Sequence, residues 1–245
     1  MAAYKPGYGK VGREYAMRMF TMPPEEDGPV WMVNLMKYKQ VAAYTDGNPS
    51  GITGKEADDR YAPTKILREI GAEVPFFGDV VDQLSGDDVK WDRVGVVKYP
   101  TRKSFLDMQN REDFKGKHEH KEAGMEFTFV IGCQPSVSIT PQNSNTNLAD
   151  GPVVVVDVFR YTDSTANNQP MTDANAAAWF NVEGTIMGDG REWDEIRFST
   201  FASMQEYTAR TDNSSALERD GRAIADSYTL VVKPSIDTFT THGAA

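Results

Sequence analysis

Two polar residues occupy matching places in apolar stretches of the chain. Asn34 lies within residues 30–38 and Asp157 within residues 153–161, where most neighbours are aliphatic or aromatic. Burying such a side chain without a hydrogen-bond partner costs about 1–3 kcal/mol, so the presence of a polar residue at both positions requires an explanation. An amide could orient a substrate, and a carboxylate in apolar surroundings has a raised pKa and could act as a base. The alternative is a hydrogen bond to backbone at the end of a strand.

Phenols accompany both polar residues. If the two stretches are strands, side-chain alternation places Tyr38 on the face of Asn34 and Tyr161 on the face of Asp157. The same faces also carry two large apolar residues, Met36 and Phe159. A phenol can donate a proton or stabilise an oxyanion. We therefore expect an apolar pocket with a few polar groups that orient a substrate or move a proton.

Two of the three histidines lie close together, at His118 and His120, and the third is His242. On one helix, His118 and His120 would project about 200° apart and could not bind the same metal. Only Glu122 stands four residues from His118, which leaves an incomplete ligand set. We expect no metal site and take His118 as a candidate general acid or base. A surface histidine in a charged helix is the alternative.

Aromatic residues could form the walls of a site for a flat, apolar ligand. Tyr61 and Trp179 fall in the expected first helix of two similar regions, and we take both as substrate-binding candidates, together with Met36 and Phe159. Packing in a core is the alternative for residues of this type. Glycine-rich nucleotide loops, a Gly-x-Ser-x-Gly elbow and Cys-x-x-Cys pairs are missing from the sequence. We therefore expect no cofactor.

Bulk composition narrows the class of protein. The 26 basic and 36 acidic residues give a net charge of −10, which disfavours binding to nucleic acid. Cys133, the single cysteine, reads as a small strand residue rather than a catalytic thiol. The sequence shows neither a run of about 20 apolar residues nor a secretory signal at its start. We expect a cytoplasmic protein with no membrane partner.

An internal repeat organises the elements that must position these residues. Gly28–Tyr38 returns as Gly151–Tyr161, and each copy is later followed by a Trp-Asp pair, at Trp91 and at Trp193. This tryptophan follows the opening glycine by 63 positions in the first copy and by 42 in the second, so the first copy holds 21 extra residues, a candidate lid.

Both copies fit the order β-α-β-β-α-β. In the first copy we expect strands at 30–38, 74–84, 91–99 and 126–133, and helices at 56–71, kinked at Pro63, and after Pro100. In the second we expect strands at 153–161, 185–187, 193–201 and 228–232, and helices at 173–182 and 203–209, the latter continued at 217–225. The predicted domains are an N-terminal helical extension (1–27), a first unit (28–135), a linker (136–150), a second unit (151–235) and a tail (236–245).

These motifs resemble the dimeric α+β barrel superfamily of ferredoxin-like domains. The resemblance rests on Gly28–Tyr38, Trp91–Pro100 with Phe105 and Met108, and Arg222–Ser227. It is closest to an uncharacterised family within that superfamily. The resemblance implies an α+β fold in which two tandem ferredoxin-like units form a pseudo-dimeric α+β barrel. Members of the superfamily include cofactor-independent monooxygenases, lyases, isomerases, cyclases, haem enzymes and proteins without known activity, so fold leaves function open.

The leading hypothesis is a cofactor-independent lyase or isomerase that acts on a small hydrophobic, aromatic compound by acid/base catalysis. Asp157 or His118 would be the base, Tyr38 and Tyr161 proton donors or oxyanion stabilisers, and Asn34 an orienting group. Retro-aldol C–C cleavage would suit this set. A cofactor-free monooxygenase and a non-catalytic binding or scaffold protein are the alternatives. The expected partner is a hydrophobic small molecule, and a homodimer is left open.

Overall fold

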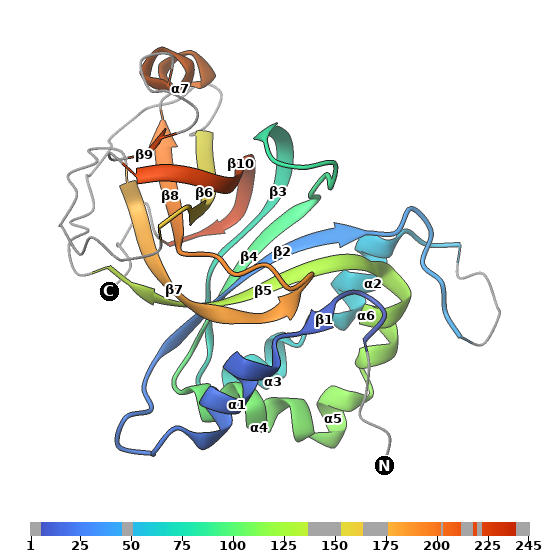
Figure 1. Ribbon diagram of the computed structural model, residues 1–245. Helices are drawn as coiled ribbons and strands as arrows, with labels where there is room; N and C mark the ends of the chain where they lie inside the picture. Colours follow the sequence, from blue (N-terminus) through green and yellow to red (C-terminus); the bar gives the residue numbers. More distant parts are fainter. Residues whose placement is uncertain are drawn as a thin grey trace. The chain divides into compact units, whose positions relative to one another are not determined.

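The computed structural model describes residues 6–45, 51–136, 153–163, 176–201, 203–211, 218–219 and 222–238 (Figure 1). Residues 137–150 of the predicted linker, the start of the predicted helix at 173–182, the end of the tail and His242 lie outside them. The chain is a mixed α and β protein. Its elements, in order, are β1 (Lys10–Val11), α1 (Arg13–Thr21), β2 (Val30–Tyr38), α2 (Gly54–Tyr61), α3 (Thr64–Glu69), β3 (Glu73–Ser85), β4 (Arg93–Tyr99), α4 (Arg102–Asn110), α5 (Glu112–Lys115), α6 (His118–Gly124), β5 (Met125–Pro135), β6 (Val153–Tyr161), β7 (Ala176–Gly188), β8 (Glu195–Phe201), α7 (Met204–Thr211), β9 (Glu218–Arg219) and β10 (Arg222–Asp237).

The described strands pair in the order β1-β7-β5-β2-β4-β3-β10-β6-β8, and β7 also pairs with β8. The order therefore returns to β7, which is the pairing pattern of a barrel. Strand β6 pairs antiparallel with β8 and β10, as do β3 with β10 and β7 with β1 and β8. No helix in the described part of the chain is long and apolar enough to cross a membrane.

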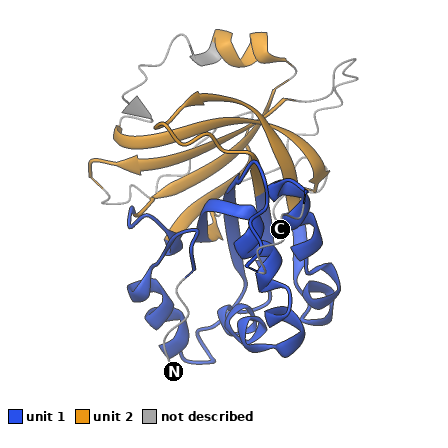
Figure 2. Ribbon diagram, turned by 90° about the vertical axis from the view of Figure 1, so that its right-hand side faces the viewer, with its two compact units in different colours: residues 1–74, 95–132, 184–191 blue, residues 75–94, 133–183, 192–245 orange. Residues whose placement is uncertain are grey.

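Two compact units divide the chain, and Figure 2 colours them separately. The first comprises residues 1–74, 95–132 and 184–191, and the second residues 75–94, 133–183 and 192–245. Each unit therefore takes residues from both copies of the repeat. The domain limits at 28–135 and 151–235 stay a prediction.

Helices of the first unit begin and end near the residues that the sequence marks as helix breaks and caps. The predicted helix at 56–71 is broken into α2 and α3 around Pro63, whose ring cannot donate to the preceding turn. Thr53 caps α2 through a capping box with Glu56. Figure 1 shows α1, α3, α4 and α5 gathered on one side of the strands of this unit. They bury a core whose largest members are Tyr15, Met19, Met32, Leu67, Tyr99, Met108 and Phe114.

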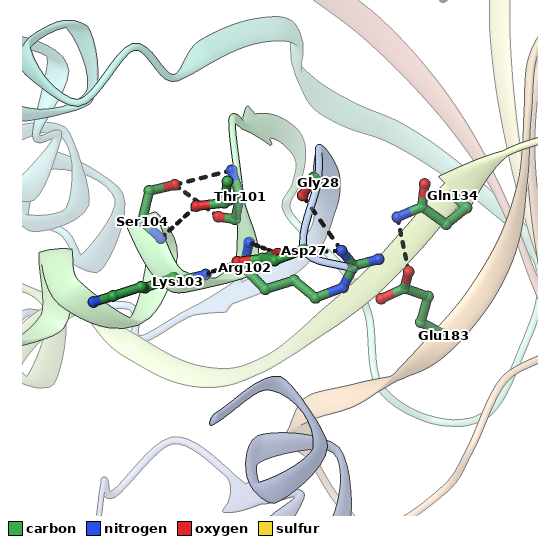
Figure 3. A network of polar contacts seen from close by, with 8 residues as sticks. All are labelled: Asp27, Gly28, Thr101, Arg102, Lys103, Ser104, Gln134 and Glu183. Atoms are coloured by element: carbon green, nitrogen blue, oxygen red, sulfur yellow. Dashed lines mark hydrogen bonds and ion pairs between the residues drawn. The ribbon is translucent and has the colours of Figure 1, made fainter. Parts of the chain in front are cut away.

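The N-terminus of α4 is held by a second capping device. Thr101 and Ser104 form a capping box, as the sequence predicts for a helix after Pro100. In addition, the Asp27 carboxylate accepts from the backbone N–H of Arg102 (2.8 Å) and of Lys103 (3.0 Å), as Figure 3 shows. The Arg102 guanidinium donates to Asp27 Oδ1 (3.4 Å) and to the carbonyl of Gly28 (3.3 Å). The start of the repeat motif is thereby tied to α4.

The second unit is built on the antiparallel pairs of β6. Val153–Phe159 of β6 pairs with Glu195–Phe201, and Val154–Tyr161 pairs with β10. The expected strands at 153–161 and 193–201 are confirmed, and the short one at 228–232 is the centre of a longer β10. One face of these strands is apolar and almost fully buried, through Val154, Val156, Val158, Ile196, Phe198, Leu230 and Val232.

In the second copy the predicted helix at 173–182 and the continuation at 217–225 are wrong, whereas the helix at 203–209 is confirmed as α7. Residues 176–182 of the predicted helix belong to β7, and the described residues of 217–225 belong to β9 and β10. Ala176–Asn181 pairs with Ser199–Glu195 of β8, so ladder hydrogen bonds and burial override the helix propensity of three successive alanines. A β-α-β-β-α-β order is therefore not found among the described residues of the second copy.

Candidate functional site

The structure divides the predicted site residues between the two units. Asn34, Met36, Tyr38, Tyr61 and His118 belong to the first unit. The remaining four, which belong to the second unit, are Asp157, Phe159, Tyr161 and Trp179. Each set is therefore described within its own unit.

Tyr38 is the centre of the first set. It lies at the end of β2 with 6% of its surface exposed, and its hydroxyl donates to Asp58 Oδ2 of α2 at 2.6 Å. The same hydroxyl lies 3.5 Å from the sulfur of Met36. Asp58 is itself buried, with 7% of its surface exposed. The hydrogen bond between the phenol and the carboxylate is therefore shielded from solvent.

Lys121 of α6 adds a positive charge to this neighbourhood. Its ammonium nitrogen lies 5.1 Å from the ring centre of Tyr61 and 5.4 Å from that of Tyr8. Burial lowers the pKa of Lys121, while the charges of Asp58 and Glu122 act in the opposite direction. Two aromatic faces and a buried carboxylate thus surround a lysine whose charged form is partly destabilised.

His118 lies on the same helix as Lys121, three residues earlier, so both project on one side of α6. Its ring packs edge-on against Phe114, with ring centres 4.9 Å apart, and Phe114 in turn contacts Tyr61 at 5.8 Å. Burial lowers the pKa of His118, the charge of Lys121 lowers it further, and Glu122 raises it. A neutral imidazole is therefore favoured, which is the form that accepts a proton.

His120 has a different partner. Its Nδ1 lies 2.8 Å from the hydroxyl of Tyr44, and the two rings meet edge-on at 5.7 Å. This agrees with the sequence-based expectation that His118 and His120 project in different directions. The His120–Tyr44 pair is a natural control for the His118 group, because it offers the same side-chain types on the same helix.

Two glycines bring α2 and α6 into contact. A Cβ added to Gly124 would lie 2.4 Å from the carbonyl oxygen of Gly54, and one added to Gly54 would lie 2.3 Å from that of Gly124. The helices lie side by side in Figure 1. Only glycine at both places allows the backbones to approach this closely, and this approach brings Asp58 of α2 within electrostatic reach of Lys121 of α6.

Asn34 hydrogen-bonds to backbone, as the alternative expects, but from the middle of β2 rather than from a strand end. Its side-chain amide donates to the carbonyls of Met32 (3.0 Å) and Gly95 (3.4 Å). These backbone bonds satisfy the polar group in its apolar strand. The structure therefore gives Asn34 a contact between β2 and β4, and its proposed orienting role stays a prediction.

Asp157 of the second unit is buried, with 6% exposed, and accepts from the hydroxyl of Thr229 at 2.7 Å. It stands opposite Arg197 in the β6–β8 register. Tyr161 donates to Glu195 Oε2 at 3.3 Å and accepts from Arg222 at 3.0 Å. Sequence alternation thus placed Asp157 and Tyr161 on one face correctly, and β8 and β10 add the charged partners to it.

Trp179 lies in a strand, which corrects its predicted placement on a helix. In β7 it pairs opposite Arg197, whose guanidinium carbon lies 4.1 Å from the centre of the Trp179 ring and 5.7 Å from that of Phe159. The rings of Phe159 and Tyr161 are stacked with centres 5.9 Å apart. The four predicted residues of this unit therefore meet around Arg197 and Glu195.

Sequence reasoning missed several of the residues that complete both groups: Asp58, Lys121, Glu195, Arg197 and Arg222. An aspartate and a lysine in polar helices look like solvated positions. The charged residues of β8 alternate with Ile196 and Phe198, and this pattern was the available signal for a second polar face. No group of three or more histidine, cysteine or acidic side chains among the described residues is arranged to hold a metal.

Comparisons with known proteins give only distant likenesses. No protein family matches the sequence, and no curated protein matches it. Among solved structures, a protein of unknown function from Rhodopseudomonas palustris is 24% identical over 55% of this chain and 99% of that chain, with a TM-score of 0.45. An anthrone oxidase-like protein is 16% identical over 85% and 92% (TM-score 0.47), and a candidate monooxygenase from Lactobacillus acidophilus 8% over 84% and 94% (TM-score 0.41). All these TM-scores are below 0.5, so the activities in the names of those proteins are not assigned to this chain.

Proposed function

We propose that the protein is a cofactor-independent lyase that cleaves a small hydrophobic, aromatic β-hydroxy carbonyl compound by acid/base catalysis in the first unit. The observation that carries this proposal is the grouping of His118 and Lys121 on one side of α6, with Lys121 under the charge of Asp58, which accepts the buried Tyr38 hydrogen bond of 2.6 Å. A base, a cation and a held carboxylate are the equipment that a retro-aldol step needs.

The step balances with these groups alone. Neutral His118 takes the proton of the substrate hydroxyl, the O–H electrons form the new C=O bond, and the C–C bond breaks. Its electron pair becomes an enolate, whose oxygen is stabilised by the ammonium of Lys121. The imidazolium then returns the proton to the enolate carbon. Tyr38 positions Asp58, and we assign the base to His118 rather than Asp157, which belongs to the second unit.

The test uses a fluorogenic aromatic β-hydroxyketone, 4-hydroxy-4-(6-methoxy-2-naphthyl)-2-butanone, whose cleavage releases a fluorescent naphthaldehyde. His118→Asn should lower kcat/KM by about 100-fold or more, as expected for loss of a general base. Tyr38→Phe should lower it by roughly tenfold through the misplacement of Asp58. Activity of the unaltered protein should fall as pH drops through the pKa of His118, below its ordinary value near 6.5, because protonation removes the base.

The matched controls are His120→Asn and Tyr44→Phe, which alter the second histidine of α6 and its tyrosine partner and should leave turnover unchanged. Equal losses in the control and test variants would contradict the assignment to His118. An uptake of oxygen that matches product formation would favour a cofactor-free monooxygenase. Binding of the ketone without cleavage would favour a non-catalytic binding protein, and either result would overturn the lyase proposal.

A further inference from the structure

A second polar group lies on one face of β6, β7 and β8 in the second unit, apart from the residues used above. Strand alternation puts Glu195, Arg197 and Ser199 on the same face of β8. The side chains of Arg197 and Glu195 are 0% and 3% exposed, and Ser199 is 2% exposed. Asp157 of β6 and Trp179 of β7 stand opposite Arg197. Burial of so many polar groups on one face is costly and calls for a function.

The charges of this group are balanced. Glu195 accepts from Arg197 Nε through one carboxylate oxygen and from Arg222 Nη2 through the other. Asp157 supplies the second negative charge and accepts from Thr229. Two guanidinium groups thus face two carboxylates. A further anion would disturb this balance, whereas a neutral ligand would not.

Trp179 Nε1 and Ser199 Oγ are buried donors of this face that have no hydrogen-bond partner among the described residues. Trp179 is 6% exposed and Ser199 2%, so both groups are away from solvent. Both neighbour Arg197 on this face, since Trp179 pairs opposite it on β7 and Ser199 follows it by two residues on β8. A buried donor without an acceptor costs about 1–3 kcal/mol. Both carboxylate oxygens of Glu195 and Oδ1 of Asp157 already accept hydrogen bonds from other groups.

Flat apolar surfaces adjoin these donors. Arg197 covers one face of the Trp179 ring, and Phe159 and Tyr161 stack with an angle of 27° between their planes. Arg222 lies 3.7 Å from the centre of the Tyr161 ring, and its side chain is the more exposed of the two arginines, at 20%. Aromatic rings and guanidinium planes both favour a planar partner.

We propose that this face of β6, β7 and β8 binds a flat, neutral aromatic compound that carries a carbonyl oxygen. The oxygen accepts hydrogen bonds from Trp179 Nε1 and Ser199 Oγ, and the ring system packs on the aromatic residues of the face. This site is independent of the lyase chemistry proposed for the first unit, because it needs neither His118 nor Lys121.

The probes are 9-fluorenone and fluorene, which have the same ring skeleton and differ by the carbonyl oxygen. Equilibrium dialysis should show fluorenone bound at least tenfold more tightly than fluorene, because only fluorenone can satisfy the two donors. Trp179→Phe keeps an aromatic ring but removes the N–H, and Ser199→Ala removes the hydroxyl. Each substitution should weaken the binding of fluorenone by about three- to tenfold and leave the binding of fluorene unchanged.

Trp193→Phe is the matched control, since it changes another buried tryptophan of the second unit, whose ring contacts Tyr228 at 5.4 Å. It should leave fluorenone binding unaltered, and circular dichroism should show all variants folded. Absence of fluorenone binding, equal affinity for both probes, or an equal loss in Trp193→Phe would overturn the proposal. Tighter binding of 9-fluorenone-4-carboxylate would also overturn it, because it would identify an anion site.

Discussion

Single residues of this protein owe their chemistry to partners that come from distant parts of the sequence. Tyr38 meets Asp58, and Tyr161 meets Arg222, through hydrogen bonds of 2.6 and 3.0 Å. Strand alternation is a property of the local sequence, so the faces of Tyr38 and Tyr161 could be predicted. Their partners depend on packing between elements, and polar helix residues such as Asp58 and Lys121 give no local sign of burial.

The pKa of His118 should measure below its ordinary value near 6.5 by NMR titration of its imidazole protons. Burial is the main cause, and the charge of Lys121 adds to it. Lys121→Met removes that charge and keeps an apolar stem of similar length, so it should raise the pKa of His118 toward the ordinary value.

Lys115→Met provides the comparison, since Lys115 pairs with Glu112 at 2.7 Å and is not among the charges that affect His118. It should leave the titration of His118 unchanged. A lower pKa in Lys121→Met, or an equal rise in both variants, would show that Lys121 does not act on His118.

At the scale of elements, the first copy of the repeat was predictable and the second only in part, because its strands at 153–161 and 193–201 are found but its helix at 173–182 is not. Pro63 and the Thr101 cap are local signals that fix where α2, α3 and α4 begin or end, and the structure confirms them. The stretch at 176–182 has three alanines followed by Trp and Phe, which suit either a helix or a strand. Only pairing with β8 decides for the strand, and this partner cannot be read from local sequence.

The contact between α2 and α6 gives an element-scale prediction. Gly124→Ala would place a methyl group 2.4 Å from the carbonyl oxygen of Gly54 and 2.9 Å from Cβ of Ala57. Backbone must move to relieve this clash, so the free energy of unfolding should fall by about 1–3 kcal/mol, measured by urea denaturation.

The paired substitution is Gly116→Ala, whose new Cβ would meet only the carbonyl oxygen of Glu112 at 3.8 Å, an ordinary contact. It should lower the free energy of unfolding by less than about 0.5 kcal/mol. If Gly124→Ala were as well tolerated as Gly116→Ala, close approach of the two helices would not be required. His118 should also titrate closer to its ordinary pKa in Gly124→Ala, because the loosened contact admits water.

At the scale of the whole molecule, the single cysteine, Cys133, can report the free energy of the opening that exposes it to solvent. It lies in β5 with 0% of its surface exposed, as expected from its apolar neighbours. Burial raises the pKa of its thiol well above the ordinary value, and the charge of Glu183 raises it further. Both the lack of exposure and the scarcity of thiolate oppose reaction with an alkylating reagent.

Iodoacetamide should therefore label native Cys133 at least about 10³-fold more slowly than the unfolded chain at the same pH, because labelling requires an opening that costs several kcal/mol. Mass spectrometry over time gives the rate. Glu126→Cys in a Cys133→Ala background moves the thiol to an exposed position of the same strand and should label within about tenfold of the unfolded rate. The labelling rate gives a free energy of opening, and its dependence on urea concentration identifies the kind of opening. A slope equal to the equilibrium m-value indicates global unfolding, whereas a slope near zero indicates a local opening. Rapid labelling of native Cys133 would contradict its burial.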